Sequence, residues 1–196
     1  ILYKNKPKIP IYNNYTLTNL FNKKIDIKSP LHISNTDLPP SSKGIQFTYM
    51  FWIFIRNIPE NAIWETNYKY KKLIFERYGS PNISYIPKSN TLVFEISYRD
   101  KYNEISLYPI NIKNIKPQKW NHITFTLDGR SSNIYLDGTL YKTSIIPNIP
   151  FIYNKNMVIG DKINDFNGYL KFGTYNNSVL KSSKIRQIFK KQQKNL

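Results

Sequence analysis

Apolar and polar positions alternate along much of this chain, with the period of two that half-buried β-strands require. In the run HITFTL, Ile123, Phe125 and Leu127 share one face, and the positions between them are polar. Many short runs of this kind follow one another, separated by turn residues such as Gly, Pro and Asn. This arrangement is typical of an antiparallel β-sandwich or barrel, which is the fold class we predict.

Two Asp-Gly pairs divide residues 116–143 into three predicted strands. Asp-Gly favours the positive φ angles that tight hairpin turns need. Asp137 and Gly138 are predicted to form a two-residue hairpin between the runs NIYL and TLYK. Asp128 and Gly129 are predicted to open a longer loop, DGRSS, between HITFTL and NIYL. The region is therefore predicted to be a three-stranded meander.

The strongest predicted strand is IQFTYMFWIFI, residues 45–55, whose odd positions are all apolar. Its even positions start polar but continue as Met50, Trp52 and Phe54, so the second face also needs cover. Aromatic rings on a sheet face can stack on sugars or fill a protein interface, and ordinary core packing is the alternative. The same hypothesis of an interface or glycan-stacking surface includes three aromatic residues that follow the strand: Trp64, Tyr68 and Tyr70.

One short helix is predicted near the end of the chain, at about residues 183–193. Ser182 or Ser183 could cap its N-terminus, because a serine hydroxyl accepts from the first backbone amides of a helix. Its apolar positions could seat the helix on the sandwich: Ile185, Ile188 and Phe189.

The chain carries 29 Lys and Arg against 12 Asp and Glu, a net charge of +17 over 196 residues. A surface of this charge attracts anionic membranes, acidic glycans or phosphates. Lys supplies most of the charge, whereas Arg is the residue that reads bases best, so we expect no nucleic-acid partner. The chain has no cysteine, which excludes disulfides and thiolate metal sites.

The first part of the chain carries Pro7 and Pro10, many Asn and Lys, and little periodicity. We interpret residues 1–22 as a basic arm or linker and residues 23–196 as the folded domain. The chain begins at Ile1 rather than Met, which indicates a processed or truncated product. The opening ILYKNKPK has the character of a flank that follows a membrane span, so one expectation is membrane association through a preceding segment.

The order of these elements resembles the concanavalin A-like lectin/glucanase superfamily, in its laminin-G-like and pentraxin-like branch. The hallmark is a Trp, a His and two Asp-Gly turns, matched here by Trp120, His122, Asp128, Gly129, Asp137 and Gly138. The resemblance covers about residues 24–190 and implies a two-sheet, jelly-roll-like sandwich in which Trp120 is a core anchor and His122 is structural. The bias towards Lys, Asn and Ile makes lectin-like virion proteins of large DNA viruses the nearest counterparts.

Glucanases of this superfamily carry paired acids spaced as E-x-D-x-x-E on one strand. The nearest candidates here are Glu95, Asp100 and Glu104, and their spacing does not match, so we predict no enzymatic activity and no cofactor. A calcium site needs several oxygen ligands that converge from loops. Four aspartates are available, of which the first two are better explained as turn residues, so no metal site is predicted: Asp128, Asp137, Asp161 and Asp165.

We therefore expect a non-catalytic structural or interaction module, placed in a virion as a minor capsid component of a giant virus. Its expected partners are other protein subunits of the assembly, with an anionic membrane or a glycan as further candidates. The alternative is a carbohydrate-binding lectin domain that uses the groove of the sandwich.

Overall fold

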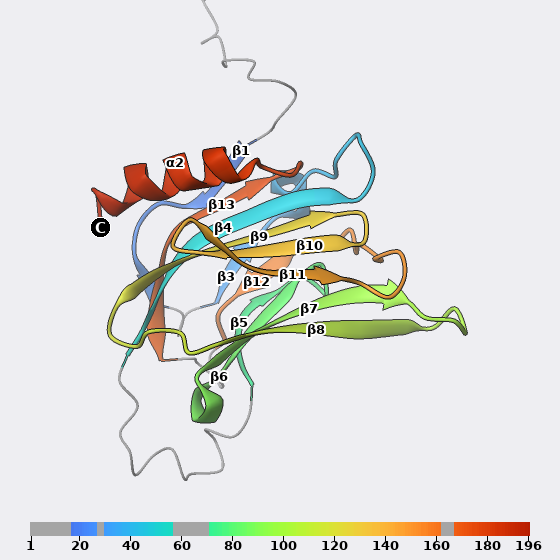
Figure 1. Ribbon diagram of the computed structural model, residues 1–196, viewed down its shortest axis with the longest axis horizontal. Helices are drawn as coiled ribbons and strands as arrows, with labels where there is room; N and C mark the ends of the chain where they lie inside the picture. The colour runs from blue at the N-terminus through green and yellow to red at the C-terminus, as the bar shows by residue number, and fades with distance from the viewer. Residues whose placement is uncertain (1–16, 27–29, 57–70, 162–166) are drawn as a thin grey trace, which may run out of the picture.

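A computed structural model describes residues 17–26, 30–56, 71–161 and 167–196 of the chain. Two antiparallel sheets face each other, and a helix, α2 (Ser182–Gln193), lies across the outer side of one of them (Figure 1). The predicted all-β, two-sheet sandwich with a short C-terminal helix is confirmed. Within the described ranges no helix is both long and apolar enough to cross a bilayer.

The first sheet has seven strands. Its order is β1 (Leu17–Phe21), β13 (Gly168–Asn176), β4 (Gln46–Ile55), β9 (Trp120–Asp128), β10 (Ser131–Leu136) and β11 (Thr139–Ile145), and β2 (Ile25–Asp26) also pairs with β13. The second sheet has six strands, in the order β3 (Leu31–Ile33), β12 (Met157–Ile159), β5 (Lys72–Glu76), β6 (Asn82–Ile86), β7 (Thr91–Arg99) and β8 (Ile105–Lys113). Two 3-10 turns follow β3 and β6, namely η1 (Asn35–Asp37) and η3 (Pro87–Ser89).

The core lies between the two sheets, where aromatic rings from opposite layers meet. Phe51 on β4 packs against Phe75 on β5 with ring centroids 4.7 Å apart. Phe125 on β9 packs against Phe94 on β7 at 5.3 Å. Each such side chain contributes about 1.5–3 kcal/mol when it leaves water, so contacts of this kind hold the layers together.

The meander is present, and its second turn is confirmed. Asp137 and Gly138 both have positive φ, at 50° and 74°, and they join β10 to β11 as a two-residue hairpin. The first turn is shorter than the predicted loop DGRSS, because β9 ends at Asp128 and β10 already begins at Ser131. The Arg130 side chain holds this tight turn by donating to the carbonyl oxygens of residues 146 and 147.

Strand β9 is buried on both faces, so the expectation of a half-buried strand is wrong for it. Its inner face carries the predicted Ile123, Phe125 and Leu127. Its outer face carries His122 and Thr124, which are also buried. The outer face is covered because α2 and the segment before it cross this side of the sheet (Figure 1).

Helix α2 begins one residue earlier than predicted, and neither serine caps it. Lys181 occupies the N-cap position, with no side-chain hydrogen bond to the first turn. The predicted seating is confirmed, since Ile185 is buried, Ile188 packs beside it and Phe189 stacks on Trp52.

The predicted N-terminal arm is too long, because its last residues form β1 in the first sheet. The ring of Phe21 lies directly against Gly173 on β13, where an added Cβ would come within 2.2 Å of it. Residue 173 therefore has to be glycine if β1 is to pack there. Residues 1–16 lie outside the described residues.

Candidate functional site

The second face of β4 is not open to solvent along most of its length. Met50 and Trp52 are 1% and 2% exposed, because α2 lies over them. Trp52 stacks on Phe189 with ring centroids 5.5 Å apart, and its indole Nε1 donates to Gln192 Oε1 at 2.8 Å. The prediction that Met50 and Trp52 form an interface or a glycan-stacking surface is therefore wrong, since the chain's own helix occupies that surface.

Phe54 is partly exposed and forms a row with two other rings. Strands β13, β4 and β9 place Tyr169, Phe54 and Trp120 in register, with Phe54 5.5 Å from Trp120 and 6.1 Å from Tyr169. Trp120 is only partly buried and is not the core anchor that the resemblance implied. It shares the outer face of β9 with His122, whereas the core-facing positions of that strand are Ile123 and its alternate neighbours.

The other aromatic residues of the predicted surface, Trp64, Tyr68 and Tyr70, lie outside the described residues. Their part in an interface or a glycan site stays a prediction.

His122 has the structural position that the resemblance implied. Its ring is fully buried, 5.0 Å from Trp52 and 5.5 Å from Phe189, and neither ring nitrogen has a hydrogen-bond partner in the described part of the chain. Burial lowers the pKa of His122 to about 4, so the ring is neutral at pH 7. Its backbone N–H donates to Asp137 Oδ1 at 2.9 Å, which ties the hairpin turn to β9.

The remaining motif residues serve the turns. Asp128 Oδ1 accepts from Gln46 Nε2 at 2.8 Å, and Gly129 supplies a positive φ of 54°. Gly138 lies against the Phe189 ring, where an added Cβ would approach to 3.0 Å. The described residues contain no group of three or more His, Asp or Glu side chains that could hold a metal ion. Asp165 lies outside them.

The three candidate acids have separate local roles. Glu95 on β7 forms an ion pair with Lys71. Asp100 Oδ1 accepts from the backbone amides of Tyr102 and Glu104, at 2.9 Å each, and so closes the turn between β7 and β8. Glu104 is exposed beyond this turn. The pairing of carboxylates that glycoside hydrolysis needs is not built from them.

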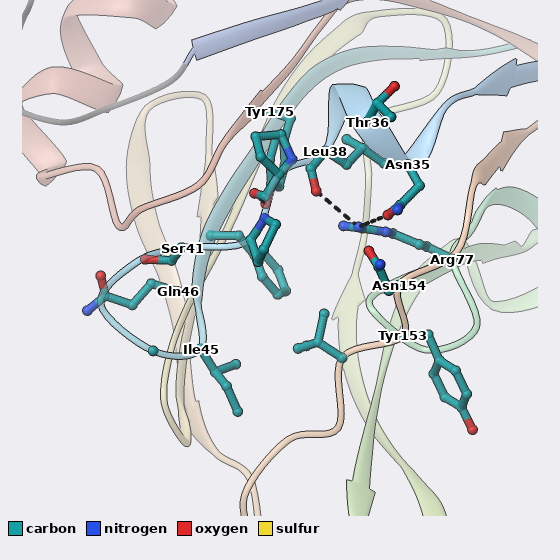
Figure 2. A pocket seen from close by; sticks show the side chains of 15 residues that line it. Asn35, Thr36, Leu38, Ser41, Ile45, Gln46, Arg77, Tyr153, Asn154 and Tyr175 are labelled. Carbon is teal, nitrogen blue, oxygen red and sulfur yellow. Dashed lines mark hydrogen bonds between the residues drawn. The ribbon is translucent and has the colours of Figure 1, made fainter.

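A pocket of about 500 Å³ opens where the loop between β3 and β4 meets the segment before β12. Its walls come from residues 35–36, 38–41, 44–47 and 152–154, together with Arg77 and Tyr175 (Figure 2). Apolar groups form most of the wall, and a few amide and hydroxyl groups are set among them. Its size and its mostly apolar lining with a few polar groups are typical of small-molecule pockets.

Arg77 holds the walls of this pocket together. Its side chain is 3% exposed and donates from Nη2 to Asn35 Oδ1 at 3.3 Å and to the Leu38 carbonyl at 3.2 Å (Figure 2). Nε donates to the Lys155 carbonyl at 3.2 Å, and Nη1 donates to the Tyr49 hydroxyl at 2.9 Å. One guanidinium therefore joins η1, the loop after it, the segment before β12 and the inner face of β4.

The hydrogen-bond acceptors of Arg77 are all neutral groups. Burial raises the pKa of Tyr49 well above its ordinary value, so the phenol stays protonated. The ion pairs within the described residues are Arg56 with Asp26 and Lys71 with Glu95, and neither includes Arg77. A buried cation without a carboxylate is costly and leaves a positive potential in the adjoining pocket.

The sequence reasoning missed this pocket. Its wall residues come from four separate stretches of the chain, in loops that carry no periodic pattern. One signal was available, which is an arginine among apolar and aromatic neighbours in the run KKLIFERY. A charged residue at that place is buried only with specific partners, and those partners are distant in sequence.

Known structures share the fold of this chain at low sequence identity. The binding domain of botulinum neurotoxin serotype G superposes with a TM-score of 0.64 and 19% identity, over 91% of this chain and 46% of that one. The receptor binding domain of the botulinum neurotoxin C/D mosaic gives 0.66 and 14%, with the same coverage. The binding domain of botulinum neurotoxin DC in complex with rat synaptotagmin II gives 0.58 and 19%, over 90% and 46%. The chain thus spans less than half the length of these solved domains.

No curated protein matches the sequence. The laminin G-like sequence profile described as the concanavalin A-like lectin/glucanases superfamily matches residues 28–186, which is most of the chain. The match and the two-sheet sandwich agree with the order of motifs in the sequence, so the chain belongs to the concanavalin A-like lectin/glucanases superfamily.

Proposed function

We propose that this chain is a non-catalytic binding module and that the pocket beside Arg77 takes a sugar unit of its ligand. The observation that carries the proposal is the pocket itself, about 500 Å³ in volume and held in shape by a buried guanidinium. A pocket whose walls are fixed before binding loses little conformational entropy when a ligand enters. Amide side chains of Asn35, Gln46 and Asn154 line it and suit the hydroxyl groups of a sugar.

Two further observations support a binding role. The acids that a glucanase would use are separate, since Glu95 is paired with Lys71 and Asp100 closes a turn. The structural neighbours are themselves described as binding or receptor binding domains, and one is in complex with rat synaptotagmin II.

A glycan array tests the proposal, with a blocking variant and a matched control. Ser41 lines the pocket and Ser42 does not, although both stand on the same exposed loop. Ser41→Trp should fill the pocket and abolish glycan binding, whereas Ser42→Trp should leave it intact. If the parent chain binds no glycan, or if Ser41→Trp binds as well as the parent, the proposal is wrong.

A place in a virion, as a capsid component of a large DNA virus, also stays a proposal. The extra apolar face on β4, one of the arguments for an interaction module, is mostly covered by α2. The described surface offers another region for protein subunits, at the edge strands β8 and β11, where several apolar side chains are exposed: Ile105, Leu107, Leu140 and Ile145. Mass spectrometry of purified particles tests this role, and absence of the chain from them would contradict it.

A further inference from the structure

We infer that the pocket beside Arg77 prefers a sugar that carries a carboxylate over the same sugar without one. This inference rests on the proposed function, and it concerns the charge of the ligand. It starts from the buried cation at the pocket wall, which has hydrogen-bond acceptors but no counter-charge among the described residues.

The described residues that line the pocket include no Asp or Glu. Three acids adjoin the wall without lining it: Glu76 directly precedes Arg77, Asp37 is exposed beside Thr36, and Asp128 accepts from Gln46 Nε2. Two lysines, Lys43 and Lys155, stand in the wall-forming loops and are exposed to solvent. Arg77 is therefore the one charged side chain among the described residues that line the pocket.

The hydrogen bonds around Arg77 leave its positive charge able to act on a ligand in the pocket. A guanidinium has five N–H groups, and neutral acceptors take four of them. The hydrogen bonds hold the cation in place but do not cancel its charge. Because the apolar wall excludes water, an anion in the pocket is attracted more strongly, and screened less by salt, than an anion at an open surface.

Methyl β-D-glucuronide and methyl β-D-glucoside form a matched pair of probes. They share one ring and differ only in a carboxylate that replaces a hydroxymethyl group. Titration of the 196-residue chain, followed by nuclear magnetic resonance, should show the glucuronide binding at least about tenfold more tightly, equivalent to about 1.4 kcal/mol. N-acetylglycine supplies a carboxylate without a sugar and should bind more weakly than the glucuronide.

A charge-reversal variant tests whether Arg77 is the source of the preference. Asn154 and Arg77 both line the pocket (Figure 2). Asn154→Asp keeps the shape of that side chain and supplies the missing counter-charge, so the preference for glucuronide should disappear. Asn111→Asp makes the same change of charge on exposed strand β8, away from the pocket wall, and should preserve the preference.

The outcomes separate this inference from the proposed function. Equal affinity for the two glycosides overturns the inference and leaves a sugar-binding module standing. Binding of neither glycoside, together with an empty glycan array, overturns both. N-acetylglycine that binds as tightly as the glucuronide overturns the requirement for a sugar. A preference that survives Asn154→Asp shows that Arg77 does not set it.

Discussion

Two buried basic side chains of the sandwich, His122 and Arg77, differ in their hydrogen bonding and in their charge. His122 lies under α2 among aromatic rings, without a hydrogen-bond partner in the described residues, and burial lowers its pKa to about 4. Arg77 lies at the loop end of the sandwich, and its guanidinium makes four hydrogen bonds. Histidine can lose its proton when water is removed, whereas arginine cannot and must be given polar partners.

The difference separates a closed region from a region that adjoins an open pocket. Under α2 the His122 ring is neutral and packs against Trp52 and Phe189, so the outer face of the sheet is closed to solvent there. Beside Arg77 the protein has kept a full charge next to a cavity of about 500 Å³. The proposed binding role rests on attraction between this charge and a ligand in the pocket.

The largest effect that we expect comes from the sealed face. Trp52→Ala should cost about 4 kcal/mol of unfolding free energy, because it empties a fully buried site and removes the contact with Phe189. Trp120→Ala should cost only about 1 kcal/mol, because that ring is partly exposed and outside the core. Urea denaturation measures both. Equal costs would show that α2 does not seal the face as described.

Breaking the Arg77 network should have the next largest effect. Arg77→Met keeps much of the side-chain volume but leaves buried acceptors at Leu38 and Tyr49 without their donor, which should cost about 3 kcal/mol. Arg130→Met is a control, because Arg130 also bonds two carbonyls but on an exposed turn. Denaturation midpoints that change equally in the two variants would contradict the special position of Arg77.

The smallest of the three effects is the pH dependence that His122 supplies. Its folded-state pKa of about 4 is below the ordinary value of 6.5, so the unfolded chain binds the proton more readily. Its contribution is therefore fully present above about pH 6.5 and is lost as the pH falls towards 4, by up to about 3 kcal/mol. His122→Leu should remove this part of the pH dependence. A parent and a variant that lose stability in parallel over that range would refute it.

The strands could be predicted from sequence because alternation and turn chemistry are local. The pair Asp137 and Gly138 predicted the hairpin correctly, and the apolar positions of residues 45–55 predicted β4. The match between an uncovered face on β4 and the apolar side of the helix was also present in the sequence. It was missed because Trp52 and Phe189 are far apart along the chain, and local patterns do not pair distant elements.

The candidate pocket could not be predicted from local sequence patterns either, because its residues are far apart along the chain. Arg77 finds its acceptors in three other segments, at Asn35 and Leu38, at Tyr49 and at Lys155. No spacing rule joins these positions, since they meet only when the sheets have formed. The motif of a Trp, a His and two Asp-Gly pairs drew attention to other parts of the molecule. Its residues shape turns and the outer face of the sheet on which α2 lies.

Amide chemical-shift mapping with a bound glycoside tests the central claim most directly. In the ¹⁵N-labelled chain, saturating methyl β-D-glucuronide should shift the amide signals of Thr36, Gly44 and Asn154, which line the pocket. The signal of Gly138, which lies against Phe189 beneath α2, should stay in place. Shifts confined to other parts of the surface, or no shifts at all, would contradict the claim that the pocket beside Arg77 is the binding site.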